Sequence, residues 1–241
     1  MSTLYLIRHG QASFGDVDYD RLSELGWEQS RLLGEYLAEV GVTLDAVFTG
    51  AQRRQIETLT AVREVFRNRG LPFPSKESVL ENFNEYDARG IITIFLPKVL
   101  ERDERVREII KNTSGIAKRS KEGRKAFQQV FEIMVDYWMR GEFESSEVES
   151  WENFNHRVRK GLERIMRDYS NGKTIAVFTS GGPIAVSLRH VLSLSGEVCI
   201  DLSWIVRNAS MTEFIYNDKK ITLAGFNMTP QLKDMAMITY R

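Results

Sequence analysis

The chain has 241 residues, 42% of them apolar and 27% charged, which is the composition of an ordinary globular protein. This length fits one large α/β domain or two small ones, with enough apolar material for a core. The 33 Lys and Arg residues balance the 33 Asp and Glu residues, and the lack of a basic excess argues against a dedicated nucleic-acid binder.

The first half of the chain is predicted to alternate strands with helices. The expected elements are a strand at 4–7, a helix from the N-cap Ser23 to Gly41, a strand at 44–49 and a helix closed by Gly70. A polar loop containing Gly10 and Gly15 connects the first strand to the first helix.

In the second half, residues 72–97 give mixed signals and are predicted as loop with short elements. From Leu100 to about Arg140 the pattern favours charged helix with an apolar stripe. The stripe consists of Phe127, Val130, Phe131, Met134, Val135 and Trp138. The later expected elements are an exposed connection at 141–149, a helix capped by Ser150, a strand at 173–178, a helix from 180–183 to about 194, and strands at 211–216 and 221–226 joined by a tight turn.

This alternation predicts a three-layer α/β/α fold with a mostly parallel central sheet covered on both faces. The helical stretch near 98–148 is expected to be an insertion within a single domain that spans residues 1–241.

The compartment predicted from the sequence is the cytoplasm. The single cysteine, Cys199, cannot form an internal disulfide, which is typical of a reducing compartment. The residues before His9 lack the basic and apolar regions of a signal peptide. No apolar run approaches the roughly 20 residues of a transmembrane helix, so no membrane partner is expected.

His9 is the first candidate for chemistry. It directly follows the first strand, at the end of the strand where open α/β sheets bind ligands. Arg8 supplies a permanent cation with forked donors suited to phosphate, and Gly10 lets the chain turn sharply. Alone, this tripeptide is a weak signal, and an ordinary loop histidine is the simpler interpretation. Ser13 in the same loop is a further candidate for binding substrate.

Arg53 and Arg54 form a second candidate cluster, after the next strand and Gly50. Arg54 falls in the first turn of a helix, where backbone N–H groups and the helix dipole favour an anion. Solvated surface charges are the usual explanation for such a pair.

The third candidate is Ser180-Gly181-Gly182-Pro183, where a strand runs into a helix with proline at its start. Two glycines let a ligand approach the backbone, and the Ser180 hydroxyl can donate to an oxyanion. A tight connection without a ligand explains the segment equally well.

The fourth candidate segment, Phe83 to Asp87, holds two carboxylates near aromatic residues. A carboxyl group with a raised pKa there would suit general acid catalysis, and Glu85 is the first choice. A solvated loop carboxylate is the commoner case.

Taken in this order, the segments resemble the signatures of the histidine phosphatase (phosphoglycerate-mutase-like) superfamily. The opening resembles its Arg-His-Gly signature, and Leu22–Gln29 resembles its Leu-Thr-x-x-Gly-x-x-Gln helix start. Arg54 to Thr58 resembles its Arg-Ala-x-Gln-Thr segment, with Glu57 where glutamine is usual. Residues 83–87 are similar to the segment bearing its acidic proton donor, and residues 177–182 to its Ser-His-Gly-Gly strand end. The resemblance covers residues 3–90 and 150–227.

One departure from the family matters most. Ser180 stands where the family usually has a second histidine, which helps enclose the phosphoryl group. The serine keeps a donor and loses a potential cation. His156 and His190 lie in predicted helices away from the strand ends, so neither is expected to replace that histidine.

The resemblance implies a metal-independent phosphohydrolase that forms a phosphohistidine on His9. Arg8 and Arg54 would offset the phosphoryl charge, Glu85 would protonate the leaving oxygen, and the turn at Ser180 and Gly181 would complete the anion site. No cofactor is expected, because the arginines neutralise charge and no Asp, Glu or His spacing indicates a metal. The expected partner is a small phosphorylated substrate or a phosphoprotein, and a homo-oligomer is left open.

Two alternatives remain at this point. A mutase would return the phosphoryl group to a second position on its substrate, and the neutral Ser180 argues mildly against it. A catalytically weak regulatory protein would keep the fold and an anion pocket. A trapped phosphohistidine separates enzyme from binder, and release of inorganic phosphate separates phosphatase from mutase.

Overall fold

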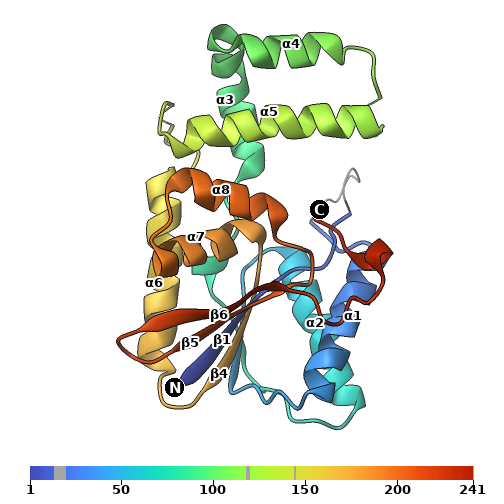
Figure 1. Cartoon of the computed structure of the whole chain (residues 1–241), viewed down its shortest axis with the longest axis vertical. Coiled ribbons are helices and arrows are strands. Elements are labelled where there is room, and N and C mark those ends of the chain that lie inside the picture. The colour runs from blue at the N-terminus through green and yellow to red at the C-terminus, as the bar shows by residue number, and fades with distance from the viewer. Residues whose placement is uncertain (14–19, 118–119, 144, 241) are drawn as a thin grey trace. The chain divides into compact units, whose positions relative to one another are not determined.

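The computed structural model of the chain describes residues 1–13, 20–117, 120–143 and 145–240 (Figure 1). Gly15 of the predicted polar loop therefore lies outside the described residues. Contacts divide the chain into two compact units, one made of Met1–Glu85 and Arg157–Arg241 and the other of Tyr86–His156.

The first unit is built on a six-stranded sheet with the order β3-β2-β4-β1-β5-β6. Its strands are β1 (Ser2–Arg8), β2 (Ala46–Thr49), β3 (Glu77–Val79), β4 (Thr174–Thr179), β5 (Met211–Tyr216) and β6 (Ile221–Met228). The first four strands of that order are parallel, and β5 and β6 add an antiparallel pair at one edge. The predicted mostly parallel sheet is confirmed.

Among the described residues, five helices belong wholly or partly to this unit. They are α1 (Glu24–Glu39), α2 (Arg53–Asn68), α6 (Trp151–Asp168, which begins in the second unit), α7 (Gly181–Leu192) and α8 (Gly196–Ile205). Short 3-10 turns occupy Glu81–Phe83 (η1) and Met235–Met237 (η2). As predicted, Ser23 caps α1, because its hydroxyl accepts from the Gly26 N–H at 3.0 Å.

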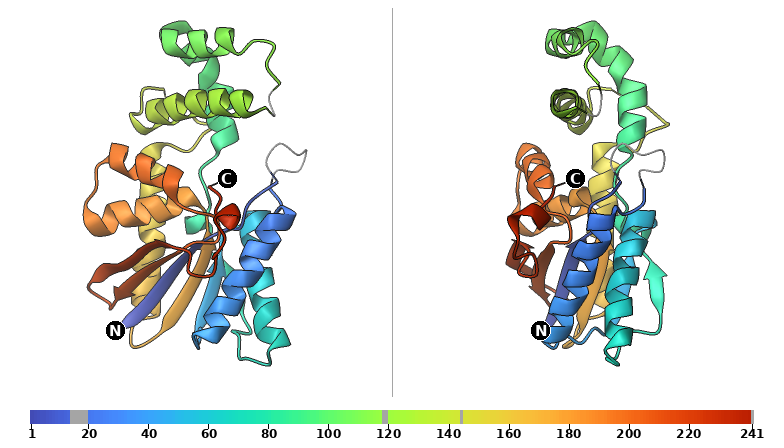
Figure 2. Two further views of the ribbon diagram at one scale, coloured as in Figure 1. Left: turned by 45° about the vertical axis from the view of Figure 1, so that its right-hand side comes forward. Right: turned by 90° about the vertical axis from the view of Figure 1, so that its right-hand side faces the viewer.

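The strands bury side chains on both faces, as a parallel sheet between helical layers requires. Ile7 and Phe178 share one apolar cluster with residues of α1 and α2, which lie side by side (Figure 2). Leu6 and Val177, which alternate with them along the strands, are also fully buried. The three-layer α/β/α class predicted from the sequence is therefore confirmed.

The second unit is helical. It contains α3 (Ala88–Arg102), α4 (Glu104–Asn112), α5 (Lys121–Met139) and the start of α6. Its core is aromatic: Tyr86, Trp138, Trp151 and Phe154 make ring contacts with centroids 4.9–6.1 Å apart. The expectation that residues near 98–148 are an insertion within one domain stays a prediction.

The structure differs from the expected elements at four points. Helix α3 begins at Ala88, inside the stretch predicted as loop, and carries Pro97 within it. The predicted helix from Leu100 to about Arg140 consists of the end of α3 followed by α4 and α5. Phe127 of the predicted apolar stripe is 44% exposed. Helix α8 was not predicted at all.

Candidate active site

The candidate residues meet at one edge of the sheet. Strands β1, β2 and β4 are parallel neighbours, so their carboxyl ends lie together. His9, Gly50 and Ser180 directly follow these three strand ends. This is the edge where open α/β sheets bind ligands.

His9 is buried and held from both sides. Its backbone N–H donates to the Thr179 carbonyl at 2.9 Å, and its carbonyl accepts from the Ala209 N–H and from Asn208 Nδ2, both at 3.1 Å. The ring nitrogen Nδ1 lies 2.7 Å from the Gly10 carbonyl oxygen. That oxygen can only accept, so Nδ1 carries the ring proton and Nε2 presents a lone pair.

Nε2 of His9 faces Arg54, whose Nε donates to it at 3.0 Å. Burial lowers the pKa of His9 well below its usual value, and the charges of Arg54 and then Arg8 lower it further. His9 is therefore a neutral imidazole whose Nε2 lone pair lies beside a cation, which is the state that a nucleophilic histidine requires.

Arg54, the second residue of α2, points into the molecule and is 7% exposed. Besides the contact with His9, it forms an ion pair with Asp20 and donates to Gln52 Oε1 at 3.1 Å. Arg8 is also buried and donates to the Val206 carbonyl. Both arginines lie close enough to His9 to lower its pKa, so the structure brings these three residues together.

Ser180 lies at the start of α7 and is fully buried. Its hydroxyl makes no capping bond; instead Gln55 Nε2 donates to Ser180 Oγ at 2.8 Å. A Cβ atom at Gly181 would lie 3.8 Å from the Arg8 guanidinium carbon. The turn at Ser180 and Gly181 is thus placed beside one of the two arginines.

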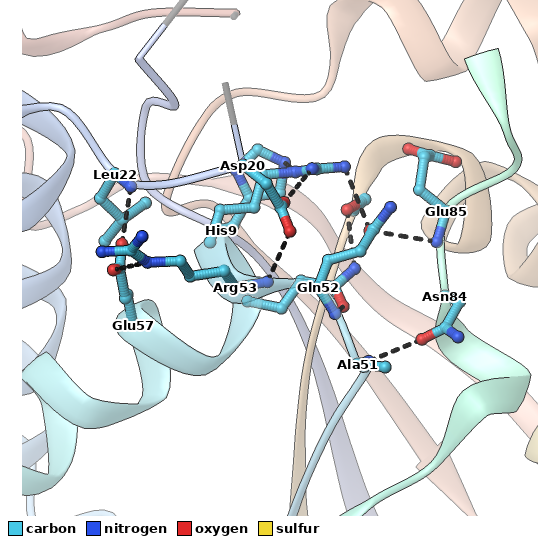
Figure 3. A network of polar contacts seen from close by, with 12 residues as sticks. His9, Asp20, Leu22, Ala51, Gln52, Arg53, Glu57, Asn84 and Glu85 are labelled. Carbon is cyan, nitrogen blue, oxygen red and sulfur yellow. Dashed lines mark hydrogen bonds and ion pairs between the residues drawn. The ribbon is translucent and has the colours of Figure 1, made fainter. Parts of the chain in front are cut away.

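Glu85 joins this group from the loop after η1. Its Oε2 accepts from the Gly182 N–H at 3.1 Å. Its own N–H donates to Gln52 Oε1 at 3.3 Å (Figure 3). Because Gln52 Oε1 also accepts from Arg54, one side-chain amide connects the arginine to the Glu85 backbone. Asp87, the neighbouring carboxylate, instead caps α3 by accepting from the Gly90 N–H.

Ser13 is engaged in the loop itself. Its Oγ donates to the Leu22 carbonyl at 3.2 Å, and its N–H donates to the Arg21 carbonyl at 2.9 Å. The hydroxyl ties the two sides of the loop together, and its role in binding substrate stays a prediction.

Gln52, Gln55 and Asp20 take part in the site although the sequence patterns did not indicate them. The two glutamines flank Arg54 in a strand-to-helix turn, and their closeness to an anion-binding helix start was the available signal. Asp20 also accepts from the Arg53 N–H at 2.9 Å (Figure 3). Nothing in its local sequence distinguishes it from other loop carboxylates.

Comparison with known proteins decides the family. The model of the histidine phosphatase superfamily (branch 1) matches residues 4–94 and 90–229. The chain belongs to this superfamily. The predicted family is thereby confirmed, and the match also includes residues between 90 and 150, where the sequence motifs gave no resemblance.

Curated relatives match the chain over a short region. The 2,3-bisphosphoglycerate-dependent phosphoglycerate mutase of Rhizobium etli is 35% identical over 68 residues, which is 26% of this chain and 32% of that protein. Mutase 2 of Lactiplantibacillus plantarum is 41% identical over 71 residues, 27% and 30% of the two chains. The matched region thus spans about a third of the length of these relatives.

Solved structures share the fold over almost the whole length. A phosphoglycerate mutase from Bacillus anthracis superposes with a TM-score of 0.63 at 20% identity, covering 96% of this chain and 95% of that one. A phosphoserine phosphatase from Entamoeba histolytica gives 0.59 at 17% identity, covering 96% and 100%. A mycobacterial glucosyl-3-phosphoglycerate phosphatase gives 0.59 at 17%, covering 95% and 98%. At such identities the likeness shows the fold, which serves mutases and phosphatases alike.

Two further observations concern the described part of the chain. It contains no group of three or more His, Cys, Asp or Glu residues placed to hold a metal ion. None of its helices is both long and apolar enough to cross a bilayer.

Proposed function

We propose that this histidine phosphatase is a phosphohydrolase in which Nε2 of His9 accepts the phosphoryl group of a small phosphoester or phosphoprotein. The observation that carries the proposal is the state of His9. Its Nδ1 proton is committed to the Gly10 carbonyl, and its Nε2 lone pair lies against Arg54. A buried neutral imidazole beside two cations is suited to attack an anionic phosphorus centre.

In the first step the bond between Nε2 and phosphorus forms while the bond from phosphorus to the leaving oxygen breaks. Arg54 and Arg8 offset the charge on the non-bridging oxygens, which is the main requirement of phosphoryl transfer. Glu85 gives its proton to the leaving oxygen, which departs as an alcohol. Glu85 is placed for this role because the Gly182 N–H, which donates to its Oε2, holds the side chain beside the turn at Ser180 and Gly181.

In the second step Glu85 takes a proton from water, and the water oxygen attacks the phosphohistidine. The P–N bond breaks, inorganic phosphate leaves and neutral His9 is restored. One residue thus serves as acid and then as base.

A mutase is the second candidate, because the curated relatives with 35% and 41% local identity are phosphoglycerate mutases. A mutase must hold the phosphohistidine until the substrate presents its second oxygen. The buried and neutral Ser180 provides no cation to stabilise the phosphohistidine, which favours hydrolysis over retention of the phosphoryl group.

The test is a screen of small phosphoesters and phosphopeptides with the full chain, in which inorganic phosphate and isomeric phosphoesters are both measured. Trapping of the phosphohistidine accompanies it. We expect phosphate release and label on His9, and a loss of several orders of magnitude in His9→Ala. His156→Ala, an exposed histidine of α6, is the matched control. Unchanged turnover in a folded His9→Ala protein would refute the assignment.

A further inference from the structure

Position 55 departs from the family as clearly as position 180 does. The Arg-Ala-x-Gln-Thr segment has alanine after its arginine, and this chain has Gln55 after Arg54. The Gln55 side chain is fully buried. Its Oε1 accepts from the Gln52 backbone N–H at 3.3 Å, and its Nε2 donates to Ser180 Oγ at 2.8 Å.

The backbone fixes the orientation of this amide. A backbone N–H can only donate, so the Gln55 atom that faces Gln52 is the oxygen. The nitrogen therefore faces Ser180 and donates to it. Ser180 Oγ is the acceptor in this contact, and its own proton remains for a different partner.

Gly50 provides the space for this arrangement. A Cβ atom at Gly50 would collide with Gln55 Oε1 and would lie 2.9 Å from Asn84 Oδ1. The side chains at three positions therefore fit together in one space: position 50 has no side chain, position 55 has a long amide and position 180 has a short hydroxyl.

The proton of Ser180 has no protein acceptor among the described residues. Ser180 begins α7 without capping it, and Gly181 beside it lies against the Arg8 guanidinium. One lone pair of this buried hydroxyl is occupied by the Gln55 amide, which restricts the directions left for its uncommitted proton. The hydroxyl is therefore available as a directed donor, because buried polar groups strongly favour a partner.

We infer that Gln55 is a positioning residue that turns the Ser180 hydroxyl toward a non-bridging phosphoryl oxygen, and that this pair occupies the place of the family's second histidine. The inference rests on the proposed function, since it needs an oxyanion at His9. We call the chain of hydrogen bonds from the Gln52 N–H through the Gln55 amide to the Ser180 O–H the relay. It supplies a neutral donor that does not titrate near pH 7, unlike a histidine.

The space around Ser180 also determines whether a histidine side chain would fit at this position. With the Gln55 nitrogen 2.8 Å from Oγ, an imidazole at position 180 has no room. We therefore expect Ser180→His alone to lower phosphate binding, and Ser180→His combined with Gln55→Ala to recover it. The recovered variant should gain a histidine titration in its pH profile of kcat/KM that wild type lacks.

A double-mutant cycle tests the relay. Gln55→Met keeps the length of the side chain and removes the donor, and Ser180→Ala removes the hydroxyl. Each should weaken binding of inorganic phosphate by about two- to tenfold, as loss of one hydrogen bond does. The double variant should be no weaker than Ser180→Ala alone, because Gln55 acts through Ser180. Ser187→Ala is the control, since that buried hydroxyl of α7 already donates to the Pro183 carbonyl, and its effect should add to that of Gln55→Met.

A second variant keeps the inference testable if Gln55→Met does not fold. Gln55→Glu retains the acceptor for the Gln52 N–H but would accept the Ser180 proton, so phosphate binding should fall at least tenfold. Additive effects of Gln55→Met and Ser180→Ala, or wild-type binding by Gln55→Glu, overturn the inference whatever the turnover. If Gln55→Met and Ser180→Ala have non-additive effects on phosphate binding but no phosphoester is hydrolysed, the role of Gln55 is supported and the proposed phosphohydrolase activity is rejected. A wild-type chain that binds no phosphate overturns both.

Discussion

The proposed mechanism depends on one residue, His9, and the surroundings of this residue determine where its ring proton lies. The Gly10 carbonyl selects the Nδ1 tautomer, while burial and two arginines oppose a second proton. The same surroundings that prepare Nε2 for attack make the folded state sensitive to acid, because an unfolded chain protonates this ring freely.

The stability of the chain should show this linkage. The pKa of His9 is well below its usual value of about 6.5 in the folded state, so the unfolded state binds more protons below that pH. Stability is therefore lost as the pH falls below about 6.5, by up to about 1.4 kcal/mol per pH unit. In urea unfolding between pH 7.5 and 5.5, His9→Asn should lose less stability than wild type. Parallel pH dependence of the two proteins would contradict the burial of a neutral His9.

Glu85 can be tested through the leaving group. General acid catalysis contributes about 10²–10⁴-fold, and it matters most when the leaving oxygen is strongly basic. Glu85→Gln should thus slow hydrolysis of alkyl phosphates far more than that of nitrophenyl phosphate. Glu81→Gln, an exposed carboxylate four residues away, serves as the control. Equal rate losses on both substrates would show that Glu85 is not the general acid.

In the proposed mechanism, Asp20 would compete with the substrate for Arg54. Its carboxylate pairs with Arg54 and is 41% exposed, so the pair is partly screened and worth about 0.2–1 kcal/mol. Asp20→Asn keeps an acceptor for the Arg53 N–H and removes the charge. We expect phosphate to bind about two- to fivefold more tightly to this variant, most clearly at low salt. The control is Glu77→Gln, which breaks the distant pair with Arg63 and should leave phosphate binding unchanged. Weaker phosphate binding by Asp20→Asn would instead show that Asp20 positions Arg54.

At the scale of elements, glycines allow α1 to lie close to the loop that carries His9. A Cβ atom at Gly10 would collide with the Gly26 carbonyl and with Ser30 Oγ, and one at Gly26 would collide with the Gln11 carbonyl. The helix and the loop are in backbone contact there, which only glycine permits. The position of His9 thus depends on the first turn of α1.

Two alanine substitutions in α1 separate this role from ordinary packing. Gly26→Ala should lower kcat/KM much more than its effect on the melting temperature explains, because it displaces the loop that carries His9. Gly34→Ala, which lies against Val62 and Val65 of α2, should lower the melting temperature without a specific loss of activity. If both variants lose activity only in proportion to stability, the glycine contact does not position His9.

Sequence patterns predicted those elements whose local signals agree with their burial. Ser23 as N-cap, the strands of the sheet and the turn at 217–220 are examples. Helix α3 was missed because Pro97, normally a helix breaker, lies inside it. The strand ends indicated His9, Arg54 and Ser180, whereas the contact of Gln55 with Ser180 joins residues 125 apart in the chain and has no local signal. The roles of these residues in catalysis stay predictions.

At the scale of the whole molecule, each of the two compact units has its own buried core. In Tyr86–His156 the core is the aromatic cluster together with Phe131, Met134 and Val135. In the other unit it consists of strand residues with α1 and α2. Cooperative units that each have a core of their own open separately, with free energies set by their own packing.

Native-state amide hydrogen exchange tests whether the helical segment is such a cooperative unit. Met134 of α5 and Leu33 of α1 are both fully buried, and replacing either with alanine should cost about 2–5 kcal/mol. Because each 1.4 kcal/mol is tenfold, Met134→Ala should speed exchange in α5 by about 30-fold or more. Amides of β1 and β4 should then exchange at the wild-type rate. Leu33→Ala should produce the opposite pattern. Equal acceleration of α5, β1 and β4 in both variants would mean that the chain opens as one cooperative domain, and the segment at 98–148 would then be an insertion without a stability of its own.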